Sequence, residues 1–293
     1  MNKFKIGKKI ISINSPTYFI ADIGANHDGS LEKAKELIYL SSKAGADAAK
    51  FQHFSAKTIV SDFGFKSLKG KFSHQKKWKK SVFEVYQDAS INLNWTSELK
   101  KTCEKFGIEF FSSPYSYEMV NHLNPFVSTF KIGSGDITWL DYIEFISKKN
   151  KPIILATGAS NLKEVKLATK RILKKNKKIV LMQCNTNYTA SKNNLKYVNL
   201  NVLRIYKKLF PEVILGLSDH TFGHTAVLGA ITLGARVIEK HFTDNNNRTG
   251  PDHKFSMNPI TWKNMVDATR ELELTLGNGI KKIENNEKQT VIL

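Results

Sequence analysis

The feature that most constrains this chain is an alternation of strand and helix patterns that repeats eight times. Short apolar, β-branched runs are each followed by a turn and then by a segment of helical length. The expected strands are residues 19–23, 46–51, 108–111, 129–132, 152–156, 178–183, 213–217 and 235–242, and the expected helices are residues 31–44, 95–106, 116–123, 138–149, 160–175, 196–210, 223–233 and 259–277. Such alternation requires parallel strands with crossover helices, and eight units over about 260 residues fit a closed barrel better than an open sheet. The sequence therefore predicts an α/β fold, a (β/α)8 TIM barrel.

Three regions lie outside the repeat or at its edges. Residues 1–18 are expected to form a short β-hairpin that closes the N-terminal end of the barrel. Residues 55–94 form an extended connection after the second strand, long enough to hang over the active-site mouth. The expected organisation is therefore a hairpin over residues 1–18, a barrel over residues 19–277 and a polar tail over residues 278–293.

Composition limits the class of protein. No apolar run approaches the roughly 18 residues that a membrane-spanning helix needs, and the basic N-terminus is not followed by the apolar segment of a signal peptide. The only cysteines, Cys103 and Cys184, lie far apart in the sequence. We therefore expect a reduced, cytoplasmic protein without a disulfide framework and without a membrane partner.

The net charge of +19 raises the question of nucleic-acid binding. The densest basic clusters, residues 69–80 and 170–178, are not interleaved with stacking aromatic residues, and no helix-turn-helix or zinc-finger spacing occurs. Solvated lysines on an enzyme surface are the better interpretation, and no nucleic-acid partner is expected. A non-catalytic basic protein that binds polyanions remains an alternative.

Polar residues collect where the expected strands end, which is where TIM-barrel enzymes carry their active sites. Side chains alternate between the two faces of a strand, and the apolar neighbours of these polar residues should meet the helices. The side chains that this alternation turns into the barrel are Lys50, Gln52, Lys131, Ser218, His220, Glu239 and His241.

Two inward lysines are costly to bury unless an anion pairs with them. They suggest a bound phosphate or carboxylate. Ion pairing with Asp22, Glu239 or Asp136 is an alternative that accounts more readily for one lysine than for both. A Schiff base on Lys50 or Lys131, as in class I aldolases, is another.

His220 and His241 end neighbouring strands. Taken singly, each is more often a hydrogen-bonded polar residue than a metal ligand. As an inward pair they can share one divalent metal and leave positions open for water and substrate. The loop after the last strand, which contains Arg248 and Asp252, offers further polar groups.

An ordered set of motifs extends these expectations. They are residues 19–29 (FIADIGANHDG), 44–52 (AGADAAKFQ), 130–136 (FKIGSGD), 218–221 (SDHT), 237–243 (VIEKHFT) and 250–253 (GPDH). Together they resemble the sialic acid synthase family, which includes the N-acetylneuraminate, legionaminate and pseudaminate synthases. The resemblance runs in order through residues 4–285.

The resemblance implies a transferase that condenses phosphoenolpyruvate with an open-chain N-acetylated hexosamine, N-acetylmannosamine or a dideoxy relative. The products would be a nonulosonic acid and phosphate, released by C–O cleavage. It implies Mn2+ or Mg2+ on His220 and His241, and a homodimer. The residues it implies are Asp22, Lys50, Lys131, His220 and His241 for catalysis, Lys50, Ser113, Lys131, Ser134, Thr186 and Ser218 for phosphoenolpyruvate, and Gln52, Asp136, Tyr188 and Asp252 for the sugar.

Several positions depart from the family pattern. Asp22 and Asp136 stand where a Glu is expected, and Ala156 stands where a Ser is expected. Family members often carry a C-terminal antifreeze-like domain that donates an Arg to the partner's sugar site, whereas this sequence stops at Leu293. We expect that another chain closes the site, that a local residue such as Arg248 substitutes, or that the sugar is bound more loosely.

Overall fold

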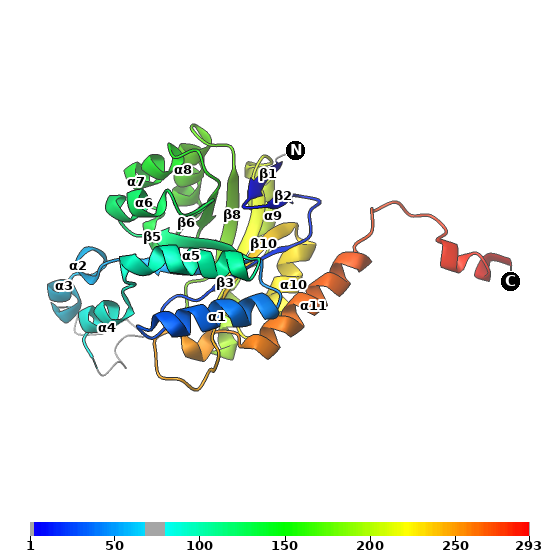
Figure 1. Cartoon of the computed structure of the whole chain (residues 1–293). Coiled ribbons are helices and arrows are strands. Elements are labelled where there is room, and N and C mark those ends of the chain that lie inside the picture. The colour runs from blue at the N-terminus through cyan, green and yellow to red at the C-terminus, as the bar shows by residue number, and fades with distance from the viewer. Residues whose placement is uncertain (1–2, 68–79, 293) are drawn as a thin grey trace.

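The computed structural model describes residues 3–67 and 80–292, and an eight-stranded parallel sheet is its central element (Figure 1). The spatial order of the strands is β5-β4-β3-β10-β9-β8-β7-β6. Their bounds are β3 Tyr18–Asp22, β4 Ala48–His53, β5 Glu109–Pro114, β6 Phe130–Ile132, β7 Ile153–Ala156, β8 Ile179–Cys184, β9 Ile214–Asp219 and β10 Ala235–His241. The first and last of these strands, β3 and β10, pair with each other, so the sheet curls into a barrel.

The barrel is nearly closed. In the part of the chain that the structure describes, β5 and β6 lie against each other but share no hydrogen-bonded ladder. The strands are apolar throughout most of their length because they are buried on both faces; all four residues of β7 are buried. The (β/α)8 barrel predicted from the sequence is confirmed.

Each strand of the barrel is followed by a helix that packs on its outside, and in the case of β4 this helix, α5, comes after a longer connection (Figure 1). The bounds are α1 Leu31–Lys43, α5 Thr96–Lys105, α6 Tyr117–Leu123, α7 Leu140–Ser147, α8 Leu162–Leu173, α9 Val202–Leu209, α10 Thr225–Thr232 and α11 Pro259–Thr275. Several begin at side-chain caps, such as the capping box of Asn161 with Glu164. The helix expected over residues 196–210 is shorter than predicted: residues Lys192–Tyr197 form a 3-10 helix, and α9 begins only at Val202.

The connection after β4 is more structured than the extended segment expected from the sequence. It contains the short helices α2 Ala56–Ile59, α3 Asp62–Ser67 and α4 Val82–Ala89, followed by the 3-10 helix η2 Leu93–Trp95. Residues 68–79, which hold most of the basic cluster at 69–80, lie outside the described residues.

A small antiparallel hairpin, β1 Lys3–Ile6 with β2 Lys9–Ser12, covers the N-terminal end of the barrel. Ile6 and Ile11 are buried and belong to the main core. The backbone N–H of Gly7 donates to Ser128 Oγ, close to the start of β6, and Lys9 pairs with Asp47, close to the start of β4. The hairpin thus closes the end opposite to the polar strand ends.

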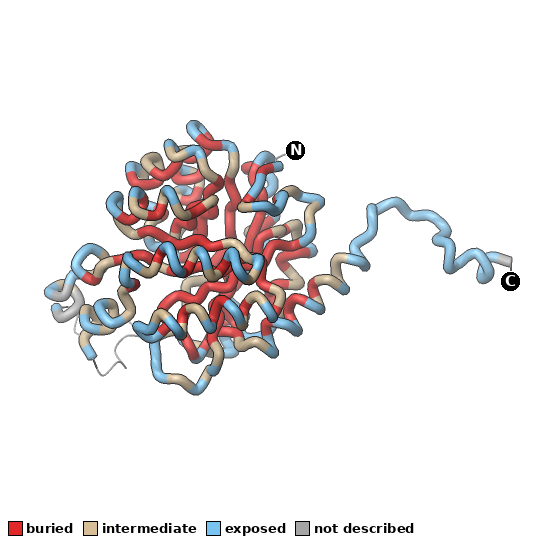
Figure 2. Tube along the Cα trace, in the orientation of Figure 1, coloured by how far each residue is buried: buried red, intermediate tan, exposed pale blue. Residues whose placement is uncertain are grey.

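Beyond α11 the chain projects away from the barrel, and its residues are exposed (Figure 2). It carries only two 3-10 turns, η6 Asn285–Glu287 and η7 Thr290–Ile292. None of the helices in the described ranges combines the length and the apolar character that crossing a bilayer requires.

The hairpin offers a test of this packing. Ile11 is 1% exposed and its neighbour Ile10 is 45% exposed. We expect Ile11→Ala to lower the free energy of unfolding by about 2–5 kcal/mol because it leaves a core cavity. Ile10→Ala, the matched control, should change it by no more than about 0.5 kcal/mol. Urea unfolding followed by circular dichroism measures both; equal effects would contradict this placement of the hairpin.

Candidate active site

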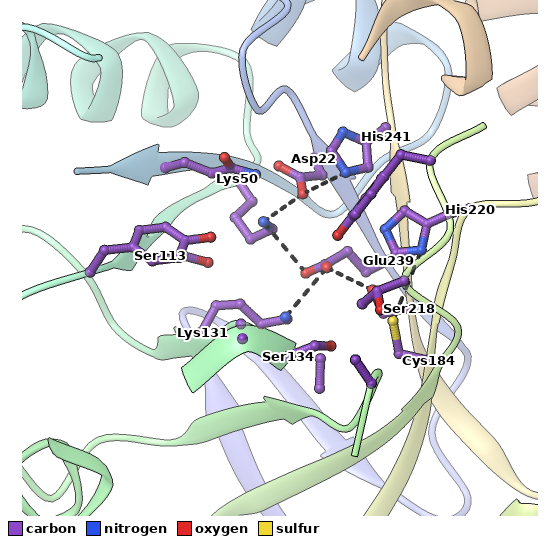
Figure 3. A pocket seen from close by; sticks show the side chains of 18 residues that line it. Asp22, Lys50, Ser113, Lys131, Ser134, Cys184, Ser218, His220, Glu239 and His241 are labelled. Atoms are coloured by element: carbon purple, nitrogen blue, oxygen red, sulfur yellow. Dashed lines mark hydrogen bonds and ion pairs between the residues drawn. The ribbon is translucent and has the colours of Figure 1, made fainter. Parts of the chain in front are cut away.

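A cavity of about 290 Å3 opens at the C-terminal ends of the barrel strands, and every strand contributes to it (Figure 3). Period-two alternation explains which side chains enter. Lys50, Lys131 and Glu239 face the cavity, whereas their strand neighbours Phe51 and Ile132 belong to the apolar core. The inward set predicted from the sequence lines this one cavity: Lys50, Gln52, Lys131, Ser218, His220, Glu239 and His241.

Four buried charges form the floor of the cavity. Lys50 Nζ lies 2.6 Å from Asp22 Oδ2 and 3.9 Å from Glu239 Oε2. Lys131 Nζ lies 3.5 Å from Glu239 Oε1. All four side chains are no more than 5% exposed. The expectation that ion pairing would account for one lysine more readily than for both is wrong, because Glu239 reaches both lysines.

This pairing keeps Lys50 charged. Burial by itself disfavours the ammonium form, but the carboxylates of Asp22 and Glu239 outweigh it and raise the pKa of Lys50. Two positive and two negative charges balance inside the cavity. Lys131 is held more loosely than Lys50, since its nearest carboxylate oxygen is 3.5 Å away.

His220 presents a defined face to the cavity. Its Nδ1 atom lies 3.0 Å from the backbone oxygen of Asn185. A carbonyl oxygen only accepts, so Nδ1 carries the proton and Nε2 carries the lone pair. Burial, with a contribution from His241, lowers the pKa of His220 to about 3. The ring is therefore neutral at pH 7, the form that binds metals.

His241 lies beside His220, with 5.4 Å between the ring centroids. Its Nε2 atom is 3.4 Å from Asp22 Oδ2 and its Nδ1 atom is 3.6 Å from Asp252 Oδ2. Burial lowers its pKa as well. Gly24 makes this crowding possible: its φ is +51°, and a Cβ there would lie 2.8 Å from Asp252 Oδ2 and 3.3 Å from the His241 ring.

Several polar atoms of the site have no hydrogen-bond partner. Asp22 Oδ1, Glu239 Oε2 and His241 Nδ1 are buried and make no hydrogen bond. Most buried polar atoms of native proteins are hydrogen-bonded, and the exceptions point to a catalytic role or to a bound water or ion. Within residues 3–67 and 80–292, no group of three or more His, Cys, Asp or Glu side chains is spaced to hold a metal alone. Two neutral imidazoles with unsatisfied atoms around them nevertheless fit a catalytic metal whose other positions are open to water and substrate.

A second cavity, of about 380 Å3, adjoins the first and shares Gln52, Tyr115, Gly135, Tyr188 and His241 with it. Asp136 and Asp252 line it. Burial raises the pKa of Asp136 to about 6, although Lys131 opposes the shift. The residues expected to bind phosphoenolpyruvate all line the first cavity, and those expected to bind the sugar line the second, or both.

Some residues of the site were not singled out from the sequence. Tyr115, which lines both cavities, could have been found by continuing the alternation two positions beyond Ser113. Phe54 and Tyr86 line the second cavity, but they belong to the connection whose fold carried no readable signal. Asn185 acts through its backbone, so its residue type gave no signal.

Two further expectations concern single residues. Arg248 pairs with Asp28 and Asp244, and it lines neither of the two cavities. The suggestion that Arg248 substitutes at the sugar site is therefore not supported. Ala156, which replaces an expected Ser, places a methyl group on the wall of the first cavity.

Comparisons with known proteins agree with this geometry. The model of the NeuB family matches residues 37–281. The chain is similar to the N,N'-diacetyllegionaminic acid synthase of Campylobacter jejuni, at 39% identity over 94% of this chain and 82% of that protein. It is similar to the pseudaminic acid synthase of the same species, at 36% identity over 92% of this chain and 77% of that protein. The solved N-acetylneuraminic acid synthetase of Leptospira borgpetersenii superposes with a TM-score of 0.85 and 26% identity, over 99% of this chain and 95% of that one.

The buried histidine pair makes a prediction about acid stability. The pKa of His220 is lowered from 6.5 to about 3, so below pH 6.5 the unfolded chain binds a proton that the folded chain does not. The free energy of unfolding must therefore fall as the pH falls. From pH 7 to pH 5 we expect His220 to contribute about 2 kcal/mol of this loss.

Urea unfolding at the two pH values, with a chelator present, measures the effect. His220→Gln should lose less stability over this interval than the unmodified protein does. The pH dependence of stability that remains in this variant comes from the other buried histidines. Burial lowers the pKa of His27 to about 4 and that of His53 to about 3. The same pH dependence in both proteins would show that His220 is not held neutral.

Proposed function

The chain belongs to the NeuB family, whose named relatives here are synthases of sialic-type acids, and on that premise we propose that it condenses phosphoenolpyruvate with an open-chain N-acetylated hexosamine. The products are a nonulosonic acid and phosphate, and the C–O bond of phosphoenolpyruvate is the bond that breaks. The observation that carries the proposal is a single cavity lined by two buried lysines, several hydroxyl groups and the pair His220 and His241.

The first cavity offers partners for the polar groups of phosphoenolpyruvate. Its phosphate and carboxylate need cationic and hydroxyl partners, and Lys50, Lys131, Ser113, Ser134, Thr186 and Ser218 all line the space. Lys131 is the lysine best placed to exchange partners, because its contact with Glu239 is loose. The Oγ atom of Ser134 accepts from the N–H of Gly158 at 2.9 Å, which leaves its own proton to donate to a phosphate oxygen.

A divalent metal, Mn2+ or Mg2+, held by His220 and His241, would polarise the aldehyde of the sugar toward attack by the enol carbon. The chain prepares this site in two ways. It keeps both imidazoles neutral by burial, and it fixes the His220 tautomer through the backbone oxygen of Asn185.

We assign to Asp22, within this proposal, the proton of the water that completes the reaction. One oxygen, Oδ2, contacts Lys50 and His241, while Oδ1 is buried without a partner. In this proposal Oδ1 orients the water and accepts its first proton as the new C–O bond forms, and that proton passes on to the alkoxide left by the aldehyde. The tetrahedral centre then collapses to the ketone, the C–O bond to phosphate breaks, and the second proton of the water leaves with the phosphate. Asp22 is one methylene shorter than the Glu expected here, so the water would sit closer to the strand end.

The sugar occupies the second cavity in this proposal. Gln52, Tyr188, Asp136 and Asp252 line it next to His241. Preorganised charges then act on both substrates: lysines on the phosphate, and the histidine-bound cation on the developing alkoxide. We further propose a homodimer and a cytoplasmic setting; the finding that Cys103 and Cys184 are both free supports the latter.

The two alternatives are less well supported. A Schiff-base lysine must become a neutral nucleophile, whereas Asp22 and Glu239 raise the pKa of Lys50. Against polyanion binding, Arg171 of the basic cluster 170–178 already pairs with Glu144.

The proposed reaction has a direct assay. We expect phosphate release only when phosphoenolpyruvate, a divalent metal and an N-acetylhexosamine are all present, and we expect His241→Ala to abolish it. The mass of the acid formed identifies the sugar that is used. Equal phosphate release without sugar would contradict the proposal, and trapping of a pyruvate adduct by borohydride would favour the aldolase.

Lys131 should act mainly on phosphoenolpyruvate. We expect Lys131→Met to raise the KM for phosphoenolpyruvate about 30-fold or more, because an anion buried in the cavity loses its charge partner. Lys163→Met, on the exposed face of α8, is the matched control and should leave KM unchanged. Steady-state kinetics at saturating sugar measure both values. An unchanged KM in the Lys131 variant would place phosphoenolpyruvate elsewhere.

A further inference from the structure

The loop that carries Asp252 follows β10 and leads to the 3-10 helix η5 His253–Phe255. Its residues 244–252 contain neither helix nor strand. A loop of this kind opens readily unless side chains tie it to the rest of the fold. Asp252 nevertheless has a defined place, because its Oδ2 atom lies 3.6 Å from Nδ1 of His241. Residues outside the loop must therefore hold it.

Asp28, in the turn between β3 and α1, binds this loop on both sides of Asp252. Its Oδ1 atom accepts from Nε2 of His253 at 3.0 Å, and its Oδ2 atom accepts from Nε of Arg248, also at 3.0 Å. Nη2 of Arg248 donates to the same Oδ2 atom. One carboxylate thus joins a point of the loop before Asp252 to the residue directly after it.

The bond between Asp28 and His253 is well defined. Burial by itself raises the pKa of Asp28, but hydrogen bonds from His253 and Arg248 outweigh it and lower the pKa. The carboxylate is therefore charged at neutral pH and can only accept, so Nε2 of His253 carries a proton. The His253 ring is fully buried, and its Nδ1 atom lies 2.6 Å from Oγ1 of Thr243. Because both ring nitrogens have partners, the chain at His253 is fixed directly after Asp252.

The turn that carries Asp28 is itself held in shape. The backbone N–H of Asp28 donates to the oxygen of Ala25 at 3.1 Å. The φ of Asp28 is +50°, in the left-handed region where Asp and Asn are the commonest residues after Gly. The same turn also reaches Asp252, whose Oδ2 atom accepts from the backbone N–H of Ala25 at 3.3 Å. The turn and the loop therefore meet at three points around Asp252.

We propose that Asp28 is a positioning residue for the metal site. Through Arg248 and His253 it fixes the loop, and the loop holds the carboxylate of Asp252 against the ring of His241. Asp28, Arg248 and His253 line neither of the two cavities, so their part is to hold other residues in place. The inference rests on the function proposed above, in which His241 binds a divalent metal.

The expected effect on the metal follows from the carboxylate beside His241. A carboxylate next to a metal-binding imidazole fixes the orientation of the ring and strengthens it as a ligand, and losing such a partner weakens metal binding by about 10- to 100-fold. Loss of Asp28 should cost the lower of these values. Asp252 itself remains, and Asn246 still donates to the backbone oxygen of His253 at 2.9 Å.

The test measures the loop and the metal separately in Asp28→Ala. Hydrogen exchange followed by mass spectrometry reports on residues 244–253, where we expect exchange about 10-fold faster or more, because hydrogen bonds to a charged group are lost. Titration calorimetry with Mn2+ should show affinity about 10-fold lower. Exchange in the barrel strands should not change. Asp267→Ala, the matched control, breaks an ion pair with Lys263 on the exposed face of α11 and should change neither measurement.

Variants of Arg248 test whether it acts with Asp28. Arg248→Met keeps the bond to His253, so Mn2+ affinity should fall only about 3-fold. Arg248→Lys keeps a cation beside Asp28 and should restore most of that loss. In the Asp28→Ala background, Arg248→Met should cause no further loss, because residues that act through one contact are not additive.

Unchanged loop exchange in Asp28→Ala would overturn this inference and leave the proposed function standing. Faster exchange with unchanged Mn2+ affinity would show that the loop does not hold Asp252 against His241, and would also overturn it. Additive losses in the double variant would do the same. If Asp28→Ala does not fold, Arg248→Met and Arg248→Lys decide the question. Absence of Mn2+ binding in the unmodified protein would instead contradict the proposed function, and this inference would fall with it.

Discussion

The site depends on four charges buried at the C-terminal end of the barrel. Removing an ion from water is costly, and only close pairing offsets that cost. Here Lys50, Lys131, Asp22 and Glu239 come from four strands, β4, β6, β3 and β10. Glu239 on β10 reaches both lysines, so one carboxylate links Lys50, two strands away on β4, with Lys131 on β6, which faces β10 across the barrel.

The positions of His220 and His241 depend on neighbouring residues whose side chains do not enter the cavity. Asp219 and Lys240, the chain neighbours of His220 and His241, do not line the cavity and form a buried ion pair. Lys240 also donates to the backbone oxygen of Thr221 at 2.6 Å, and Thr221 donates to Asp219. Asp219 and Thr221, which flank His220, are thus bonded to Lys240, which precedes His241. This network explains how two strand ends can present two rings in a fixed relation.

Much of this arrangement could be predicted from the sequence, for a physical reason. Strands buried on both faces are apolar, so inward polar residues such as Lys50, Lys131 and His241 stand out against their neighbours. The alternation also identified Glu239. What it could not predict was that Glu239 serves both lysines, since this depends on the width of the barrel and on side-chain reach. The alternation also could not identify Phe54 and Tyr86, which line the second cavity, because short helices such as α4 have too little periodicity and their position depends on tertiary contacts.

The central claim is that one cavity accepts both phosphoenolpyruvate and a divalent metal. The charges of the side chains that line the cavity already balance, so a polyanion such as phosphoenolpyruvate gains little from binding there alone. A cation at His220 and His241 should strengthen the binding of phosphoenolpyruvate. Thermodynamic linkage requires that phosphoenolpyruvate strengthen the binding of the metal by the same factor. The most direct measurement is a calorimetric titration of phosphoenolpyruvate into metal-free and Mn2+-loaded protein. The account predicts affinity at least about 10-fold higher with Mn2+, a coupling in the range usual for linked sites, and no such gain in His241→Ala. Equal affinity with and without Mn2+ would contradict it.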